Sequence, residues 1–300
     1  MVRFGVAGYP LAFSNSSLKK DRMKIFEWIK SLNLDAFEAQ MTYGPKTSVE
    51  NCKLIKSLSK DFNVTVSVHA AYYIVLTSKE KDKIRRSIET LKKTYELADI
   101  MGADVIVLHP GPLYGEDSRI VFDRLSENLE LFFNEIGNSH IGLFLETAGK
   151  KGQLGSVEEI IKLSNQFNGC FPCFDFGHIH ARTGGSLSTP ESIDNLFKTF
   201  NKYDLFNTKK RIHFHYTPID YGPKGEITHK AIDDIYPISN QQTLNFFNDA
   251  PKDNLYHPRF EPIIKNFSQI KSNFTVISET HNSQEIGAMS MKNLYNKIIK

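Results

Sequence analysis

The stretch Thr65-Val66-Ser67-Val68-His69 decides the fold, because it is a short β-branched run that stops at a side chain able to bind a metal. The pattern recurs five more times along the chain, each time as a short apolar run followed by His, Asp or Glu. The six residues at these strand ends are His69, His109, Glu146, Asp175, His213 and Glu279. Parallel α/β folds build their sites beyond the carboxyl ends of the strands. We therefore expect these six side chains to converge on one place.

The apolar runs alternate with longer segments of helical periodicity. Strands are predicted at 2–7, 35–39, 64–68, 104–108, 141–145, 171–174, 210–215 and 274–278. Helices are predicted at 20–32, 48–62, 79–101, 117–136, from 156, from 190 and at 284–299. Alternating strands and helices imply parallel strands with right-handed crossovers. The sequence thus predicts a closed (β/α)8 TIM barrel, with residues 1–300 as a single domain.

One connection is unusually long. Residues 216–258 contain several turn residues and show no clear period. Loops of this length in a compact domain are usually functional lids or binding loops. Because this one follows the seventh predicted strand, we expect it to lie over the site.

Composition, net charge and cysteine content limit the classes of protein to which the chain can belong. The 300 residues are 40% hydrophobic and carry a formal net charge of +3, which permits a nucleic-acid partner without requiring one. Cys170 and Cys173 form a lone C-x-x-C pair inside a predicted strand, where alternation points them to opposite faces. We expect a reduced, cytoplasmic chain. No signal peptide is visible and no apolar run approaches the ~20 residues that cross a bilayer, so we expect no membrane partner.

The residue types at the strand ends favour a transition metal. Imidazoles together with carboxylates suit zinc, manganese or iron better than calcium or magnesium. Six ligands exceed what one tetrahedral zinc can use, so a cluster bridged by a carboxylate is expected. Two metals about 3.5–4 Å apart can stabilise the attacking and leaving oxygens of a phosphoryl displacement.

Six stretches give the sequence a family resemblance. They are 67–72 (SVHAAY), 108–111 (LHPG), 145–149 (LETAG), 174–178 (FDFGH), 212–214 (IHF) and 278–280 (SET). Together they resemble the endonuclease IV family of apurinic/apyrimidinic endonucleases, within the xylose-isomerase-like barrels. The resemblance covers essentially the whole chain. The loop at 222–226 is most similar to the shorter archaeal relatives.

The resemblance implies a distribution of metal ligands. His69, His109 and Glu146 would hold one zinc. Glu146 would bridge to a second zinc, whose other ligands would be Asp175, His213 and Glu279. His178 would hold a third zinc with a histidine of the long loop, for which we favour His229 over His257.

The chain also departs from the family pattern. The family has a D-x-H pair in the loop, whereas Ile227 stands two residues before His229; Glu226 could substitute, or the site could hold only two metals. Tyr72 matches an aromatic residue that the family places against DNA. His180 and His215 lie beside assigned ligands and are predicted to be supporting or structural.

The resemblance implies a zinc-dependent endonuclease acting in base excision repair. Glu146 would be central to catalysis, with two or three zinc ions, or manganese, as cofactor. A metal-activated hydroxide would attack the phosphorus 5′ to an abasic site in damaged double-stranded DNA. The protein is expected to act as a monomer.

Two alternatives stay open. A metal-dependent sugar isomerase or epimerase would use Glu146, Asp175, His213 and Glu279 around a single metal, so these four residues do not discriminate. His69 and His109 do, because such an enzyme does not need them as ligands. The other alternative is a non-catalytic binding protein on a degenerate barrel.

Overall fold

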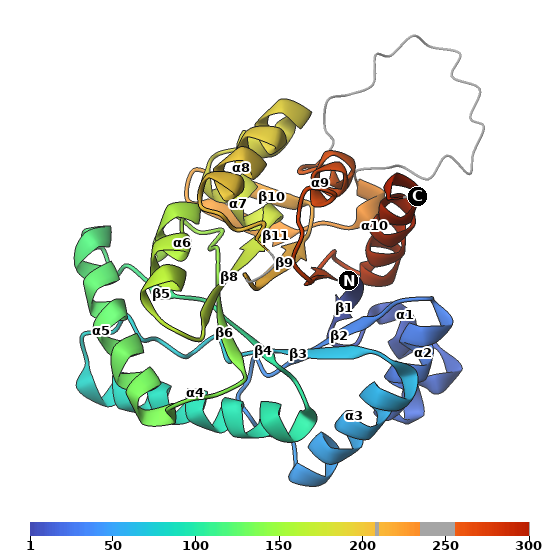
Figure 1. The fold of residues 1–300 in the computed structure, drawn as a ribbon, viewed down its shortest axis with the longest axis horizontal. Helices are drawn as coiled ribbons and strands as arrows, with labels where there is room; N and C mark the ends of the chain where they lie inside the picture. The colour runs from blue at the N-terminus through green and yellow to red at the C-terminus, as the bar shows by residue number, and fades with distance from the viewer. Residues whose placement is uncertain (208–209, 235–255, 300) are drawn as a thin grey trace.

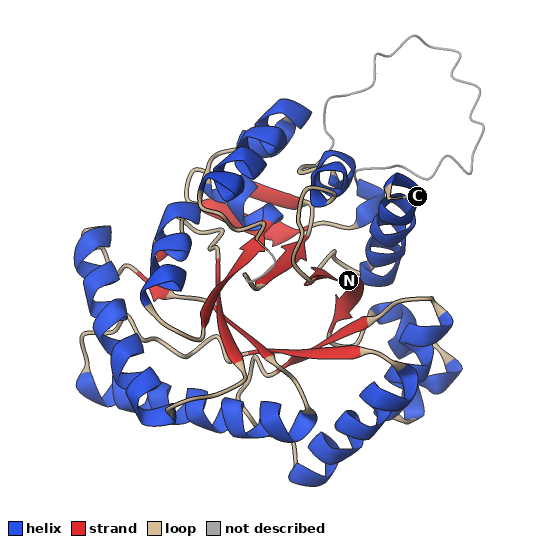
Figure 2. Ribbon diagram, viewed as in Figure 1, coloured by secondary structure: helices blue, strands red, loops and turns tan. Residues whose placement is uncertain are grey.

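The computed structural model describes residues 1–207, 210–234 and 256–299. Eight parallel strands form a closed barrel, and helices surround it as an outer layer (Figure 1, Figure 2). The predicted TIM barrel is therefore confirmed. The barrel strands are β1 (Val2–Ala7), β2 (Ala36–Gln40), β3 (Thr65–His69), β4 (Val105–Leu108), β6 (Gly142–Glu146), β8 (Cys170–Asp175), β9 (Ile212–Tyr216) and β12 (Phe274–Ser278). Around the barrel they follow chain order, and β1 closes against β12.

The outer helices are α2 (Ile25–Ser31), α3 (Val49–Phe62), α4 (Lys81–Met101), α5 (Ser118–Ile136), α6 (Val157–Gln166), α8 (Pro190–Lys202), α9 (Phe260–Phe267) and α10 (Gln284–Ile298). Apart from α2 and α9, they agree closely with the helical periods in the sequence. Their ends follow local chemistry. Ser156 and Glu159 form the expected capping box at α6, and Gly102 ends α4 with a left-handed backbone at φ 73°.

One predicted helix is wrong in extent. Residues 20–32 were expected to be a single helix, but α2 begins only at Ile25. Two short 3-10 turns, Ser17–Lys20 and Arg22–Lys24, precede it. The Asp21 carboxylate accepts a hydrogen bond from the Met23 amide, and such local bonds compete with helix propagation.

Short elements lie at the carboxyl ends of the strands. Strand β5 (Gly111–Pro112) pairs with β7 (Gln153–Leu154), and helices α1 (Leu11–Asn15) and α7 (Phe176–Arg182) follow β1 and β8 directly. The first part of the predicted long loop is an antiparallel hairpin of β10 (Ile219–Gly222) and β11 (Gly225–His229). Residues 235–255 of that loop lie outside the described residues.

Aromatic packing fills the space between the barrel and its helices. Phe174 stacks on Phe200 of α8 with ring centroids 4.2 Å apart, and Phe214 packs 5.0 Å from Phe267 of α9. At about 1.5–3 kcal/mol for each fully buried large side chain, this layer contributes much of the stability. No helix among the described residues has both the length and the apolar character to span a membrane.

Candidate metal centre

Side chains inside the barrel form two layers. A strand points every second residue to the same face, so residues two apart on one strand occupy successive layers. The layer nearer the amino ends of the strands contains three register pairs: Glu38 with Ser67, Val107 with Phe144, and Cys173 with His213. Because the strands are staggered, Val107 also pairs with His69, and Cys173 with Glu146, of the next layer. The next layer toward the carboxyl ends contains Gln40, His69, His109, Glu146, Asp175 and His215. Most predicted ligands thus share the upper layer.

The first predicted ligand set is brought together. The Nε2 atoms of His69 and His109 lie 3.4 and 3.3 Å from Oε2 of Glu146. Ligand atoms of all three residues lie within 4.8 Å of one another. Glu146 is completely buried at the end of β6, so the group is rigidly placed.

The second set differs from the prediction by one histidine. Glu146, Asp175 and Glu279 gather as expected, but the histidine among them is His215. His215 Nδ1 lies 3.0 Å from Oε1 of Glu146 and 3.6 Å from Oε1 of Glu279. His213 instead lies one layer lower, where its Nε2 is 3.1 Å from Oε2 of Glu38.

The physical reason for this difference is the register of β9. Strand β9 extends to Tyr216, and its register pairs His215 with Asp175 and His213 with Cys173. Both histidines face the barrel interior, so alternation alone does not choose between them. Their height relative to the neighbouring strand decides.

A third group forms between α7 and the hairpin. Ligand atoms of His178, Glu226 and His229 lie within 4.8 Å of one another. Glu226 Oε2 is 3.7 Å from Nε2 of His178, and its Oε1 is 3.7 Å from Nε2 of His229. The structure therefore places Glu226 between His178 and His229, as its predicted substitution for an aspartate requires. His257 is not in this group and packs against the ring of His180.

Backbone carbonyl groups fix the orientation of three of the histidines. Nδ1 of His69 lies 3.0 Å from the Ala70 carbonyl, that of His178 2.9 Å from Thr147, and that of His229 3.1 Å from Glu279. A carbonyl only accepts, so each Nδ1 donates, and each Nε2 is the nitrogen that faces the carboxylates and could bind a metal. This is the arrangement that oriented metal ligands adopt.

Three buried polar atoms in these groups accept or donate no hydrogen bond among the described residues. They are Oε2 of Glu146, Oδ2 of Asp175 and Nδ1 of His109. An unpartnered buried polar atom is costly, and in native structures it calls for an ion or a water molecule. The converging donors match the nitrogen and oxygen preferences of zinc, so the residues fit such a metal.

Charges in the site stabilise each other strongly. Burial by itself would raise the pKa of Glu146, but the neighbouring His109 and His215 hold it well below its usual range. Burial lowers the pKa of His109 to about 4. Burial also acts to lower the pKa of His69, but its hydrogen bond to Glu146 and the nearby carboxylates outweigh this and raise it to about 9. Glu146 is therefore available as an anion, as metal binding requires.

The centre opens onto a cleft. This cleft has a volume of about 570 Å³ and is lined by Tyr9, Glu226, His229 and Glu279 among others. Tyr72, predicted to touch the substrate, lies in the loop after β3 and is 65% exposed. Its ring is in contact range of two more exposed rings, Tyr43 at 6.1 Å and Tyr73 at 5.8 Å. Exposed aromatic rings of this kind can stack on nucleobases or sugars.

A family model described as the xylose isomerase-like TIM barrel matches residues 26–288. The chain belongs to this family. An uncharacterized protein of Methanocaldococcus jannaschii, MJ0133, is 28% identical over 236 residues, covering 78% of this chain and 83% of its own length. A probable endonuclease 4 of Aquifex aeolicus is 24% identical over 254 residues, covering 79% of this chain and 90% of its own. The resemblance to endonuclease IV is thereby confirmed.

A solved structure of an enzyme that acts on a sugar shares the fold. D-psicose 3-epimerase of Clostridium cellulolyticum H10 superposes with a TM-score of 0.66 at 12% identity, over 99% of both chains. At this identity the match supports the barrel alone. The activity must therefore be argued from the site of this family member.

Two members of the site were missed in the sequence. The sequence predicts His215 to be supporting or structural. However, it lies two residues after His213, so both side chains point to the same face of the strand. Glu38 is not among the predicted ligands, because it does not end its strand: β2 continues to Gln40, which is not His, Asp or Glu. The alternation of apolar and polar residues in β2 was the available signal.

Proposed function

We propose that this protein is a zinc-dependent phosphodiesterase of the endonuclease IV type, which cleaves DNA 5′ to an abasic site. The observation that carries this proposal is the number of side chains that could bind a metal. Three groups share or adjoin Glu146: His69 with His109, then Asp175 with His215 and Glu279, and then His178 with Glu226 and His229. A single metal cannot use all of these donors.

The side chains have distinct roles in this proposal. His69, His109 and Glu146 would hold one metal, and Glu146 would bridge to a second held by Asp175, His215 and Glu279. His178, Glu226 and His229 would hold a third. Bound zinc would supply Lewis-acid activation of water and charge neutralisation at the phosphate. This sharing makes Glu146 the residue on which the reaction depends most.

The centre is accessible from one side. Glu279 and His229 line the cleft and face solvent in part, whereas Glu146 and Asp175 are fully buried beneath them. A phosphodiester would approach from the cleft side. Tyr72 and its neighbouring tyrosines would then receive the sugar or base that is displaced from the duplex.

Metal content and a nicking assay together test the proposal. We expect two or three zinc ions per chain and cleavage of a duplex with one abasic site, but not of the matched intact duplex. Glu146→Gln should lower nicking by more than the 10- to 100-fold typical of residues that support ligands, that is by more than about 100-fold. Glu135→Gln, which breaks an exposed pair with Lys92 on the outer helices, is the matched control and should cleave normally. One bound manganese and no nicking would refute the proposal.

A second candidate is favoured by one observation. Glu146, Asp175, His215 and Glu279 form a four-ligand group by themselves, which suffices for a one-metal sugar isomerase or epimerase. Epimerisation of a keto-sugar by protein with one metal per chain would support this candidate. Dependence of the activity on His69 would count against it.

A further inference from the structure

Glu38 is a buried carboxylate that the proposed reaction does not use. It lies on β2 in the lower interior layer and is fully shielded from solvent. Its Oε2 accepts a hydrogen bond from Ser67 Oγ at 2.9 Å, and its Oε1 accepts one from Gln40 Nε2 at 3.3 Å. A charge buried this deeply is tolerated only when it is well paired. The remaining partners of Glu38 are therefore informative.

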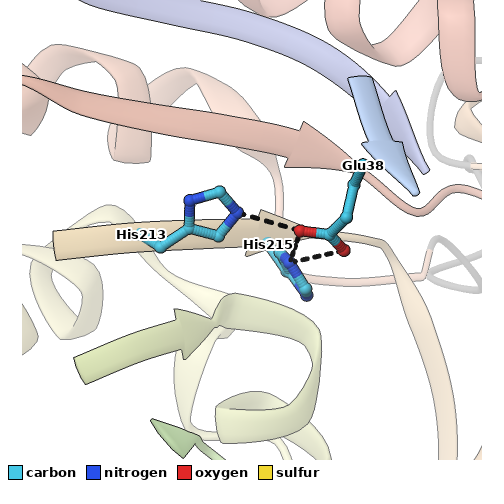
Figure 3. A group of neighbouring side chains, drawn as sticks. All are labelled: Glu38, His213 and His215. Atoms are coloured by element: carbon cyan, nitrogen blue, oxygen red, sulfur yellow. Dashed lines mark hydrogen bonds and ion pairs between the residues drawn. The ribbon is translucent and has the colours of Figure 1, made fainter. Parts of the chain in front are cut away.

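Those partners are two histidines of β9 (Figure 3). His213 Nε2 lies 3.1 Å from Oε2 of Glu38, and His215 Nε2 lies 3.2 Å from the same carboxylate. An ionised carboxylate only accepts hydrogen bonds. Nε2 of His215 therefore donates to Glu38, and Nδ1, 3.0 Å from Glu146, donates to that carboxylate while no metal is bound. A metal bound between Glu146 and Glu279 would replace the proton on Nδ1 and leave the proton on Nε2.

This orientation is the reverse of that of the other oriented histidines. His69, His178 and His229 each turn Nδ1 to a backbone carbonyl and Nε2 to the centre. In His215 it is Nδ1 that faces Glu146, and Nε2 points away from the centre to Glu38.

A metal held by Glu38, His213 and His215 is the competing interpretation. The distances of 3.1 and 3.2 Å join nitrogen to oxygen, and two ligand atoms of one tetrahedral zinc also lie about 3.3 Å apart, so these distances alone do not discriminate. Both carboxylate oxygens already accept protein hydrogen bonds. The local hydrogen bonding thus favours a saturated network over a fourth metal.

We propose that Glu38 is a positioning residue, which fixes His215 as the Nε2–H tautomer so that Nδ1 is its metal-binding atom. The inference rests on the proposed function only in requiring a metal between Glu146, Asp175, His215 and Glu279. It holds whichever substrate the centre acts on. Carboxylate partners of this kind typically change metal affinity by about 10- to 100-fold.

The wild-type protein provides the first test. Protein labelled with 15N-histidine and loaded with zinc is examined by long-range proton–nitrogen NMR, with His215 assigned from its absence in His215→Gln. We expect a proton on Nε2 of His215 and on Nδ1 of His69, His178 and His229. A zinc-loaded wild-type protein with a proton on Nδ1 of His215 would overturn the inference without any variant of Glu38.

Two variants give the second test, read as zinc affinity and stoichiometry. Glu38→Gln offers His215 both a donor and an acceptor, so we expect about 10- to 100-fold weaker binding of one zinc. His213→Asn leaves the Glu38–His215 pair intact and should bind zinc as the wild type does. Unchanged affinity in a folded Glu38→Gln protein overturns the inference, and so does loss of one zinc in His213→Asn. Wild-type protein that binds no zinc refutes the proposed function as well, which separates the two failures.

Discussion

Glu226 and His229 bring a carboxylate oxygen and an imidazole nitrogen to within 3.7 Å of each other, although they are three residues apart on β11. Residues at odd spacing in a regular strand point to opposite faces. Here Asp220 pairs with Thr228 and Tyr221 with Glu226, so Ile227 has no partner on β10. Because of this bulge, the Glu and His of an E-x-x-H sequence face the same side, as the two ends of a D-x-H sequence do in a regular strand. Ile227 itself points outward and is 63% exposed.

The bulge leads to a prediction about deletions. Removing Ile227 alone leaves Glu226 and His229 two residues apart in a regular ladder, still on one face. We expect this variant to keep all its zinc. Removing Ile227 and Thr228 together makes them adjacent and places them on opposite faces, so one zinc should be lost while the others remain. Metal analysis of both folded variants checks this, and equal zinc loss in the two would show that the bulge has no such role.

Gly149 is the residue that makes room for Glu226. A Cβ atom at position 149 would lie 2.7 Å from Oε2 and 2.8 Å from Cβ of Glu226, and 3.0 Å from His178 Cδ2. Gly149→Ala should therefore displace Glu226 and lower the occupancy of one zinc, with about a 10- to 100-fold fall in its affinity. Gly152→Ala is the matched control, because a Cβ there meets no described atom within 4 Å. If both variants bind zinc equally, Glu226 is not a ligand.

The barrel was predictable from the sequence because strand and helix periods are local. Strand β3 and helix α4, for example, match their predicted ranges to within one or two residues. Helix α9 was not predicted, since it follows a long segment with no clear period. The interior layers of side chains were harder to predict from the sequence, because they depend on how neighbouring strands are staggered.

In the site, too, some residues were predictable from local sequence, whereas others depend on how strands pair. His69, His109 and Glu146 end their strands, so the last polar residue of each run was sufficient to bring them together. For β9, the choice between His213 and His215 needed the pairing of Asp175 with His215, which no single strand encodes. Glu226 needed the bulge, which arises only when β10 and β11 pair.

His69 separates a multi-metal centre from a one-metal centre. His69→Ala removes a ligand from the group with His109 and Glu146 but leaves the group of Asp175, His215 and Glu279 intact. We expect zinc content to fall by one and nicking to fall by more than about 100-fold, with the circular dichroism of the barrel unchanged. His140→Ala removes an exposed histidine near Asp99 and serves as control. Full zinc content in His69→Ala would make His69 structural.

Glu116 links the loop that follows β3 to the start of α5. Its two oxygens accept from Arg124 at 3.0 and 2.9 Å, and Lys79 Nζ lies 3.0 Å away. Arg124 also donates to the Thr77 carbonyl at 2.9 Å. These hydrogen bonds, first to Arg124 and then to Lys79, lower the pKa of Glu116 to about 2.

A carboxyl whose pKa is lower in the folded state stabilises the fold above its unfolded pKa of about 4.3, and this stabilisation is lost as the pH falls toward the folded value. Glu116→Gln should therefore lower the free energy of unfolding by a constant amount from pH 7 to 5. The difference from wild type should shrink below about pH 4.5 and vanish near pH 2. Urea unfolding of metal-free protein across this pH range measures the difference in free energy of unfolding. Glu135→Gln, which breaks an exposed ion pair with Lys92, is the control. A difference that persists undiminished to pH 2 would mean that Glu116 acts through packing and not through its charge.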